Sequence, residues 1–368
     1  MHKSSSVVRG LNGAGRMVLA GTAGLRRALF YVLAAMLALG CGSEASAKKR
    51  RSETTPPPPR TEIPIARTVM SSGSVRYWVP VMIGGIGPIR ALLDTGSTGL
   101  LVLNRALEGK GFPKAGSFVY GFDSNEILSG TINQARVRMG DLTSDGAVRF
   151  GVIRKTKCAP KKPKCSIDAL KPGDYGIGGD GTAGEGFDAI IGIGLDHILI
   201  ANPLVAAHAG SWIVTLPQPG TSGNGTIVVN PTTADLEGFR RYKISMESLR
   251  LLGAFRAALP GCLATVDGAL NVCGQVGLDT GAPKVYAKIA TVPPLADSTT
   301  PRRYTLRMSE GEGKIEIPVD ETLRLRRLVY FDATPKQKTP LINAGVFPYF
   351  DYQVFYDFKN NEIGLKKR

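Results

Sequence analysis

Residues 91–98 read ALLDTGST, and residues 278–281 repeat the centre of that stretch as LDTG. In both places an apolar run leads directly into Asp-Thr-Gly, and a second apolar run follows at residues 100–103 and 285–287. Short apolar runs bounded by turn residues are typical of buried strands. The chain therefore carries two copies of a strand–turn–strand unit whose aspartates lie 185 residues apart, which predicts two similar lobes.

The remainder of the sequence also favours strands. Residues 75–83 alternate apolar and other side chains, which is the period of a β-strand. Residues 304–308 and 315–319 alternate in the same way on either side of the glycine-rich stretch 310–313, as in a hairpin. The chain has 45 Gly and 24 Pro, and no long amphipathic helix is evident. We expect an all-β protein.

Asp94 and Asp279 are the predicted catalytic residues. An apolar strand delivers each aspartate to a buried place, and two carboxyl groups held close together cannot both ionise easily. One keeps its proton and donates it to a substrate carbonyl, while the other acts as a general base toward a water molecule. The predicted chemistry is hydrolysis without a covalent intermediate.

The residues that follow each aspartate have supporting roles in this prediction. Glycine permits a tight turn and lets two backbones approach each other, and a threonine hydroxyl can reach across to the opposite turn. The residues expected to support the pair are Thr95, Gly96, Ser97, Thr280 and Gly281.

Six segments occur in the order found in the pepsin-like aspartic peptidase family. They are residues 91–98, 187–194, 225–229, 278–281, 354–355 and 360–365. The sequence resembles this family over roughly residues 74–366. The resemblance implies a bilobal acid protease fold, in which two pseudo-twofold-related, β-barrel-like lobes hold the active site in the cleft between them. It also implies an extended peptide or protein as substrate, with neither a metal nor a cofactor.

The family carries a tyrosine on a hairpin flap that closes over the substrate. Residues 118–122 lie in the right interval, so Tyr120 is the flap candidate, although an ordinary strand tyrosine is an equal alternative. The tryptophan that usually follows the first turn is replaced by Leu101.

Two further departures concern the second turn. The family has Ser or Thr after each Asp-Thr-Gly, and Ser97 fits whereas Ala282 does not. A lost donor to Asp279 disfavours its ionised form, which predicts activity extending toward neutral pH. Asn343 stands where a glycine is expected. Either its side chain distorts the second turn, or Gly345 takes the role of that glycine through a change of register.

The composition along the chain suggests four parts. Residues 1–47 are expected to be a leader, and residues 48–70, with a basic run and four prolines at 56–59, a tether. A short inhibitory pro-segment is the alternative for that stretch. The N-terminal lobe is expected at 71–222 and the C-terminal lobe at 223–368, because residues 217–225 are rich in Gly, Pro and Ser.

The leader predicts export. Its apolar stretch at residues 28–40 is too short to cross a bilayer comfortably and follows two arginines, as in a signal peptide. Cleavage after residues 45–47 (ASA) is one interpretation; a lipobox at residues 38–41, leaving a lipidated Cys41, is the other. The expected location is the periplasm or the outer membrane of a bacterium, as a lipoprotein tethered through Cys41, or the outside of the cell.

The other four cysteines form two close pairs in the sequence, Cys158 with Cys165 and Cys262 with Cys273. Local disulfides are the simplest of the three possible connectivities, and they fit an oxidising compartment. No CxxC or Cys/His cluster occurs, which argues against a zinc site.

Charge and histidine content restrict other functions. The net charge is +16, but the basic residues are scattered and no aromatic platform accompanies them, so we expect no nucleic-acid partner. Beyond residue 47 the histidines are His197 and His208, neither in a serine- or cysteine-hydrolase motif. A monomer is expected, since one chain supplies both aspartates.

The rival hypotheses are not enzymes. One is a catalytically inactive binding or inhibitor protein with the pepsin fold, because a fold does not fix a function. The other is a lipid-tethered cell-wall binding protein, suggested by the basic surface and the proline-rich stretch.

Overall fold

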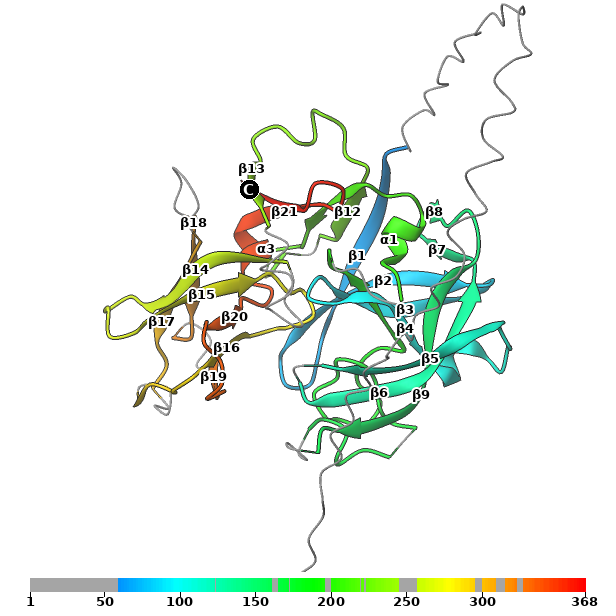
Figure 1. The fold of residues 1–368 in the computed structure, drawn as a ribbon, viewed down its shortest axis with the longest axis horizontal. Helices are drawn as coiled ribbons and strands as arrows, with labels where there is room; N and C mark the ends of the chain where they lie inside the picture. The colour runs from blue at the N-terminus through cyan, green and yellow to red at the C-terminus, as the bar shows by residue number, and fades with distance from the viewer. Residues whose placement is uncertain are drawn as a thin grey trace, which may run out of the picture. The chain divides into compact units, whose positions relative to one another are not determined.

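The computed structural model describes residues 59–368, with gaps at 123, 161–164, 172, 196–199, 219, 222, 245–256, 295–299, 309–314 and 323–326. The leader, its two cleavage sites, Cys41 and tether residues 48–58 lie outside the described residues. Residues 57–368 form one compact unit, which is built mainly of strands (Figure 1). The helical segments among the described residues are short: η1 (Asn104–Leu107), α1 (Pro203–Ala206) and α3 (Pro348–Asp351). The all-β prediction is confirmed.

The strands form two sheets. The larger has the order β13-β22-β21-β11-β12-β1-β2-β3-β10-β4-β9-β6-β5, with β7 joined to β2 and β8 joined to β7. Its strands are β1 (Thr61–Val69), β2 (Val75–Ile83), β3 (Ile86–Asp94), β4 (Thr98–Leu103), β5 (Lys114–Gly121), β6 (Glu126–Ala135), β7 (Val137–Met139), β8 (Leu142–Thr143), β9 (Val148–Cys158), β10 (Ala189–Ile193), β11 (Ser211–Thr215), β12 (Gly225–Val229), β13 (Arg240–Lys243), β21 (Tyr352–Asp357) and β22 (Glu362–Lys367).

The smaller sheet has the order β18-β17-β14-β15-β20-β16-β19. Its strands are β14 (Ala258–Thr265), β15 (Asn271–Gly277), β16 (Val285–Ile289), β17 (Arg303–Met308), β18 (Ile315–Asp320), β19 (Val329–Ala333) and β20 (Leu341–Asn343). The predicted strands at residues 75–83, 100–103 and 285–287 are present, and those at residues 304–308 and 315–319 pair antiparallel.

The sequence repeat corresponds to a repeated arrangement of strands. In the larger sheet, β10 lies between β3 and β4, parallel to β3 and antiparallel to β4, and β9 pairs in parallel with β4. In the smaller sheet, β20 lies in the same way between β15 and β16, and β19 pairs in parallel with β16. The Asp-Thr-Gly turns follow β3 and β15, so both turns occupy the same place in the repeated arrangement.

The tether prediction is wrong for residues 61–69, which form β1. The first half of this strand pairs with β12 and the second half with β2. Ile63 and Ile65 are fully buried, so the segment contributes to the core. The two-residue spacing of these isoleucines is typical of a strand, but the nearby prolines and basic residues suggest an extended spacer instead.

The boundary predicted at residues 222 and 223 does not separate the two sheets. β12 follows the boundary, yet it pairs with β1 and β11 in the larger sheet. The C-terminal strands β21 and β22 also join that sheet, where β21 pairs with β11. The chain therefore enters the smaller sheet at β14 and returns to the larger sheet at its end.

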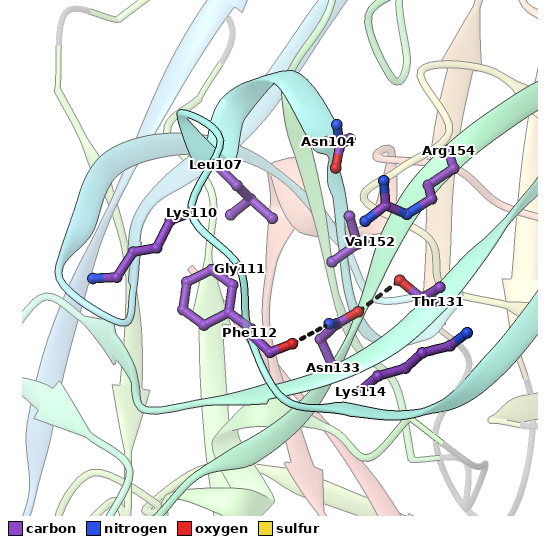
Figure 2. Close-up of a pocket in the computed structure, with 10 residues that line it drawn as sticks. All are labelled: Asn104, Leu107, Lys110, Gly111, Phe112, Lys114, Thr131, Asn133, Val152 and Arg154. Carbon is purple, nitrogen blue, oxygen red and sulfur yellow. Dashed lines mark hydrogen bonds between the residues drawn. The ribbon is translucent and has the colours of Figure 1, made fainter.

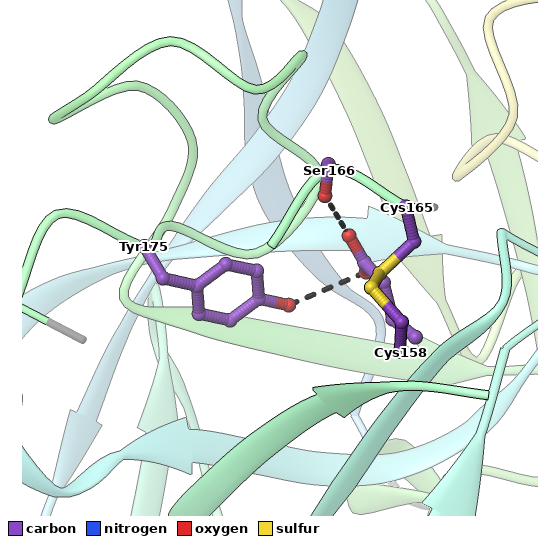
Figure 3. The surroundings of a disulfide bond; sticks show 5 residues. Cys158, Cys165, Ser166 and Tyr175 are labelled. Carbon is purple, nitrogen blue, oxygen red and sulfur yellow. Dashed lines mark hydrogen bonds between the residues drawn. A yellow bond between two sulfur atoms is a disulfide. The ribbon is translucent and has the colours of Figure 1, made fainter. Parts of the chain in front are cut away.

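Both predicted disulfides are present. Cys158 at the end of β9 is bonded to Cys165, and Figure 3 shows this bond beside Ser166 and Tyr175. Cys262 and Cys273 lie directly opposite each other on β14 and β15 and are bonded. Two disulfides indicate an oxidising compartment. No helix in the described part of the chain is long and apolar enough to cross a membrane.

The position of β1 predicts where the chain can be shortened. A chain starting at residue 58 should fold, because residues 57–368 form one compact unit. A chain starting at residue 71 lacks two fully buried isoleucines, each worth about 1.5–3 kcal/mol, and leaves the edges of β2 and β12 unpaired. We expect its melting temperature, measured by circular dichroism, to fall by at least about 5 °C. Equal melting temperatures for the two chains would contradict the role of β1.

Candidate active site

The structure brings the two predicted catalytic turns together. Asp94 ends β3 and Asp279 follows β15, and their exposed fractions are 5% and 9%. A Cβ atom built on Gly96 would lie 2.5 Å from Cγ of Asp279, and one built on Gly281 would lie 2.9 Å from Cγ of Asp94. Each glycine thus lies against the carboxyl group of the opposite turn, where any side chain would collide with it.

Four hydrogen bonds connect the turns. The Thr280 hydroxyl accepts from the Thr95 backbone N–H (3.1 Å) and donates to the Leu93 carbonyl (2.8 Å). The Thr95 hydroxyl accepts from the Thr280 backbone N–H (3.0 Å) and donates to the Leu278 carbonyl (3.0 Å). All four bonds are buried. The structure therefore contains the reciprocal contacts expected of the two threonines.

Two buried tyrosines extend this connection on one side. The Thr95 hydroxyl donates to a carbonyl, so it accepts from the Tyr349 hydroxyl at 2.7 Å. The Tyr349 hydroxyl in turn accepts from that of Tyr356, whose ring stacks on Trp212 at 6.0 Å. Burial raises the pKa of both tyrosines, so both keep their protons. This pair could not be predicted, because nothing in the sequence spacing of the two tyrosines points toward Thr95.

Each carboxyl oxygen of the pair has a donor. Asp94 Oδ1 accepts from the Gly96 N–H at 2.8 Å, and its Oδ2 accepts from the Ser97 hydroxyl at 2.5 Å. Asp279 Oδ1 accepts from the Gly281 N–H at 2.7 Å. Asp279 Oδ2 accepts from Nδ2 of Asn343 at 2.6 Å.

The Asn343 contact corrects one expectation. Ala282 was expected to leave Asp279 without a side-chain donor, but the amide of Asn343 supplies one from β20. Asn343 is buried and does not displace the turn, because the residue whose backbone lies closest to the turn is Gly345. A Cβ built on Gly345 would lie 2.4 Å from the Lys284 carbonyl oxygen and 2.7 Å from that of Ala282, and its φ is +59°. The structure therefore agrees with the second interpretation, in which Gly345 takes the role of the expected glycine through a change of register.

Burial is the main influence on the titration of Asp279. It raises the pKa of Asp279 well above its ordinary value, the negative charge of Asp94 raises it further, and the hydrogen bond from Asn343 opposes both. Asp279 therefore holds its proton more tightly than an ordinary aspartic acid does. The pKa of Asp279 is raised by its burial and by the neighbouring carboxylate, and not by the alanine at position 282.

Arg76 also reaches the second turn. It lies on β2, and its guanidinium donates to the Gly281 carbonyl at 2.5 Å. Its Nε is buried without a hydrogen-bond partner in the described part of the chain. Burial lowers the pKa of Arg76, and the nearby Asp279 opposes that shift. Nothing in the sequence distinguishes this arginine from the many other scattered basic residues.

Tyr120 lies on β5, which forms a hairpin with β6. The Phe122 N–H donates to the Glu126 carbonyl to close the turn, and the rings of Tyr120 and Phe122 are 4.9 Å apart. Tyr120 packs on a hydrophobic cluster that includes Leu101 and Leu128. The hairpin exists as expected, and the flap role of Tyr120 stays a prediction.

Hydrogen bonds hold the turn end of this hairpin next to a disulfide. Glu126 lies opposite Cys158 in the pairing of β6 with β9. Its buried carboxyl group accepts from the hydroxyl of Ser166, which follows Cys165, and from that of Tyr175 at 3.3 Å (Figure 3). Burial raises the pKa of Glu126. The contacts hold the turn end against the disulfide loop.

A separate cavity of 480 Å³ lies among η1, β5, β6 and β9 (Figure 2). Its lining residues are Asn104, Leu107, Lys110, Gly111, Phe112, Lys114, Thr131, Asn133, Val152 and Arg154. The Asn133 amide accepts from Thr131 at 2.7 Å and donates to the Phe112 carbonyl at 2.8 Å. None of the catalytic candidates lines this cavity.

Among the described residues, no group of three or more His, Cys, Asp or Glu side chains is placed to hold a metal ion. Comparison of the chain with protein-family models and with curated protein sequences gave no match.

The reciprocal bonds predict a difference between two substitutions of Thr280. Thr280→Val removes the partner of the Thr95 N–H and of the Leu93 carbonyl, and each orphaned buried group costs about 1–3 kcal/mol. Thr280→Ser keeps the hydroxyl. We expect urea unfolding to show a clear loss of stability for Val and a small one for Ser. Equal losses would mean that the methyl group, not the hydroxyl, matters.

The raised pKa of Asp279 predicts how stability depends on pH. The folded protein holds a proton that the unfolded chain has already released above about pH 4, so this group's contribution falls as pH rises through the folded-state pKa. Asp279→Asn should therefore gain melting temperature relative to the wild type between pH 4 and pH 8. Asp168→Asn, which removes a carboxyl group from an exposed position, is the matched control for the substitution itself. A constant difference for Asp279→Asn would contradict the raised pKa.

Proposed function

We propose that this protein is an aspartic endopeptidase in which Asp94 and Asp279 activate one water molecule. The observation that carries the proposal is the contact between the two buried turns. Each glycine lies against the opposite carboxyl group, and each carboxyl group accepts one backbone and one side-chain hydrogen bond. This arrangement fixes two carboxyl groups for shared acid–base work.

The reaction follows from the difference between the two carboxyl groups. The Asp94 carboxylate takes a proton from water, whose oxygen bonds to the carbonyl carbon of the substrate. Asp279, whose pKa is raised by burial, gives its proton to the carbonyl oxygen. Asp94 then passes its proton to the amide nitrogen as the C–N bond breaks, and Asp279 recovers a proton as the carbonyl re-forms. The products are a carboxylic acid and an amine, and both carboxyl groups return to their starting states.

The fold supports the same proposal. The arrangement around β3, β10, β4 and β9 recurs in β15, β20, β16 and β19, as a bilobal pepsin-like fold requires. The resemblance in sequence gives an extended peptide or protein as the substrate, bound by a monomer without a cofactor. The disulfides fit an exported protein, in the periplasm, on the outer membrane through Cys41, or secreted.

The test is cleavage of a mixed peptide library by residues 58–368 between pH 3 and pH 8. Asp94→Asn and Asp279→Asn should each reduce cleavage at least about 100-fold, because each removes one proton-transfer group. The raised pKa of Asp279 should extend activity toward neutral pH. Asp168→Asn, an exposed change, should leave cleavage unchanged.

A statine-type transition-state analogue separates the rival function. Inhibition of cleavage by the analogue would support the peptidase. Folded protein that cleaves nothing at any pH yet binds peptides would instead be a catalytically inactive binding protein.

A further inference from the structure

The cavity among η1, β5, β6 and β9 is surrounded by positive charge. Three basic side chains line it, those of Lys110, Lys114 and Arg154, and none of the described residues that line it is acidic. Its volume of 480 Å³ lies in the range of sites that hold small organic molecules. Like charges gathered around a hollow raise the local potential and attract ions of the opposite sign. The cavity is therefore suited to an anion.

The centre of the cavity is apolar. Leu107 and Val152 are each 2% exposed, and Phe112 lies beside them in the lining. Figure 2 shows these three side chains grouped together, with the guanidinium of Arg154 turned toward Val152. A molecule that fits both parts of the cavity has an apolar body and at least one negative group.

The strands that carry two of the cations are irregular at the cavity. Between two successive pairs, β9 has one residue more than β6, and that residue is Arg154. A side chain on Gly130, which lies next to this bulge, would collide with the backbone of β9. On the other side of β6, the register of β5 shifts directly after Lys114. Bulges re-aim side chains and recur next to functional sites, so both neighbours of β6 depart from regular pairing where they present a cation to the cavity.

Two of the three cations have no partner within the described part of the chain. Neither the Lys114 nor the Arg154 side chain takes part in an ion pair or a hydrogen bond there. Lys110 donates to the Gly84 carbonyl at 2.7 Å, which holds the ammonium in place without neutralising its charge. An arginine can give two parallel hydrogen bonds to a carboxylate or a phosphate. The guanidinium of Arg154 is therefore available for such a group.

We propose that this cavity binds a small organic anion, a molecule that carries a phosphate or a carboxylate group on an apolar body. The apolar body lies against Leu107 and Val152, and the negative group lies at Arg154. Lys110 and Lys114 add positive charge at the margin of the cavity. The two catalytic aspartates take no part, so the inference does not depend on the proposed peptidase function.

Such a ligand would give β5 a second attachment. Among the described strands, β5 is the last at its end of the larger sheet and pairs with β6 alone. A ligand held between Lys114 on β5 and Arg154 on β9 spans β6 and links β5 to the strand beyond it. β5 also carries Tyr120, so the ligand would restrain the hairpin on which this tyrosine lies.

Isothermal titration calorimetry of the protein with four small molecules tests the proposal. Phenyl phosphate and isophthalate carry negative groups on a ring, whereas inorganic phosphate lacks the ring and phenol lacks the charge. We expect a Kd of about 1 mM or below for at least one of the two ring-bearing anions. Inorganic phosphate and phenol should bind at least about tenfold more weakly, because each lacks one of the two recognised parts.

The two ring-bearing anions also distinguish the chemical source of the charge. Binding of phenyl phosphate alone would identify the ligand as a phosphate, and binding of isophthalate alone would identify it as a carboxylate; either result supports the proposal. Binding of neither anion would overturn it. Binding of phenol as tightly as of phenyl phosphate would also overturn it, because the cavity would then select for the ring and not for the charge.

Two arginine substitutions on β9 separate the cavity from the general basic surface. Arg154→Gln should weaken binding of the tighter anion at least about tenfold, because it removes a charge-assisted hydrogen bond. Arg149→Gln is the matched control, since it removes the same charge from an exposed position of the same strand but outside the cavity. Arg154 is exposed as well, so both variants should fold. Equal weakening by the two substitutions would overturn the proposal.

Hydrogen exchange locates the bound anion. At saturation, the tighter of the two ring-bearing anions should slow exchange of the backbone amides of β5, because the ligand opposes local opening of this edge strand. Arg154→Gln should remove that protection at the same concentration of the anion. Protection of other segments with none in β5 would place the anion elsewhere and overturn the assignment of the site to this cavity.

Discussion

The reciprocal hydrogen bonds between Thr95 and Thr280 are the constraint on which the rest of the site depends. Two carboxyl groups in contact and removed from water repel each other as soon as both are charged. The turns that carry them follow strands of different sheets and lie 185 residues apart in the chain. Each threonine hydroxyl offsets this repulsion, because it accepts a hydrogen bond from a backbone N–H of the opposite turn and donates one to a backbone carbonyl there. Tyr349 adds a buried donor on one side.

The two halves of the site are similar in backbone and different in side chains. The main-chain donors to Asp94 and Asp279 are equivalent, because both come from the glycine two residues later. The side-chain donors are not equivalent, since one is local and the other comes from β20. The difference arises next to Gly345, whose left-handed backbone lets β20 place an asparagine beside the turn. The approach of Arg76 to Gly281 adds a positive charge on the same side.

The sequence was sufficient to predict the paired turns and their strands, because the apolar runs around each Asp-Thr-Gly are short and clearly bounded. It could not predict the role of Asn343, which depends on how β20 is shifted against β15, and a shift of one residue turns a side chain to the other face. The assumption that Ala282 leaves a gap failed for the same reason. β1 was missed because its proline and basic neighbours obscured the spacing of Ile63 and Ile65.

The separation of the two aspartates along the chain determines when the site can exist. The two turns follow strands of different sheets, and the chain between them runs through much of the larger sheet before it enters the smaller one at β14. Contacts between residues this distant in sequence form late, since closing long loops costs entropy before any contact rewards it. A nascent or unfolded chain thus carries two ordinary, separated carboxylates. In the proposed peptidase, hydrolytic capacity would therefore arise in a single late step, and the chain would be inactive while it is still folding.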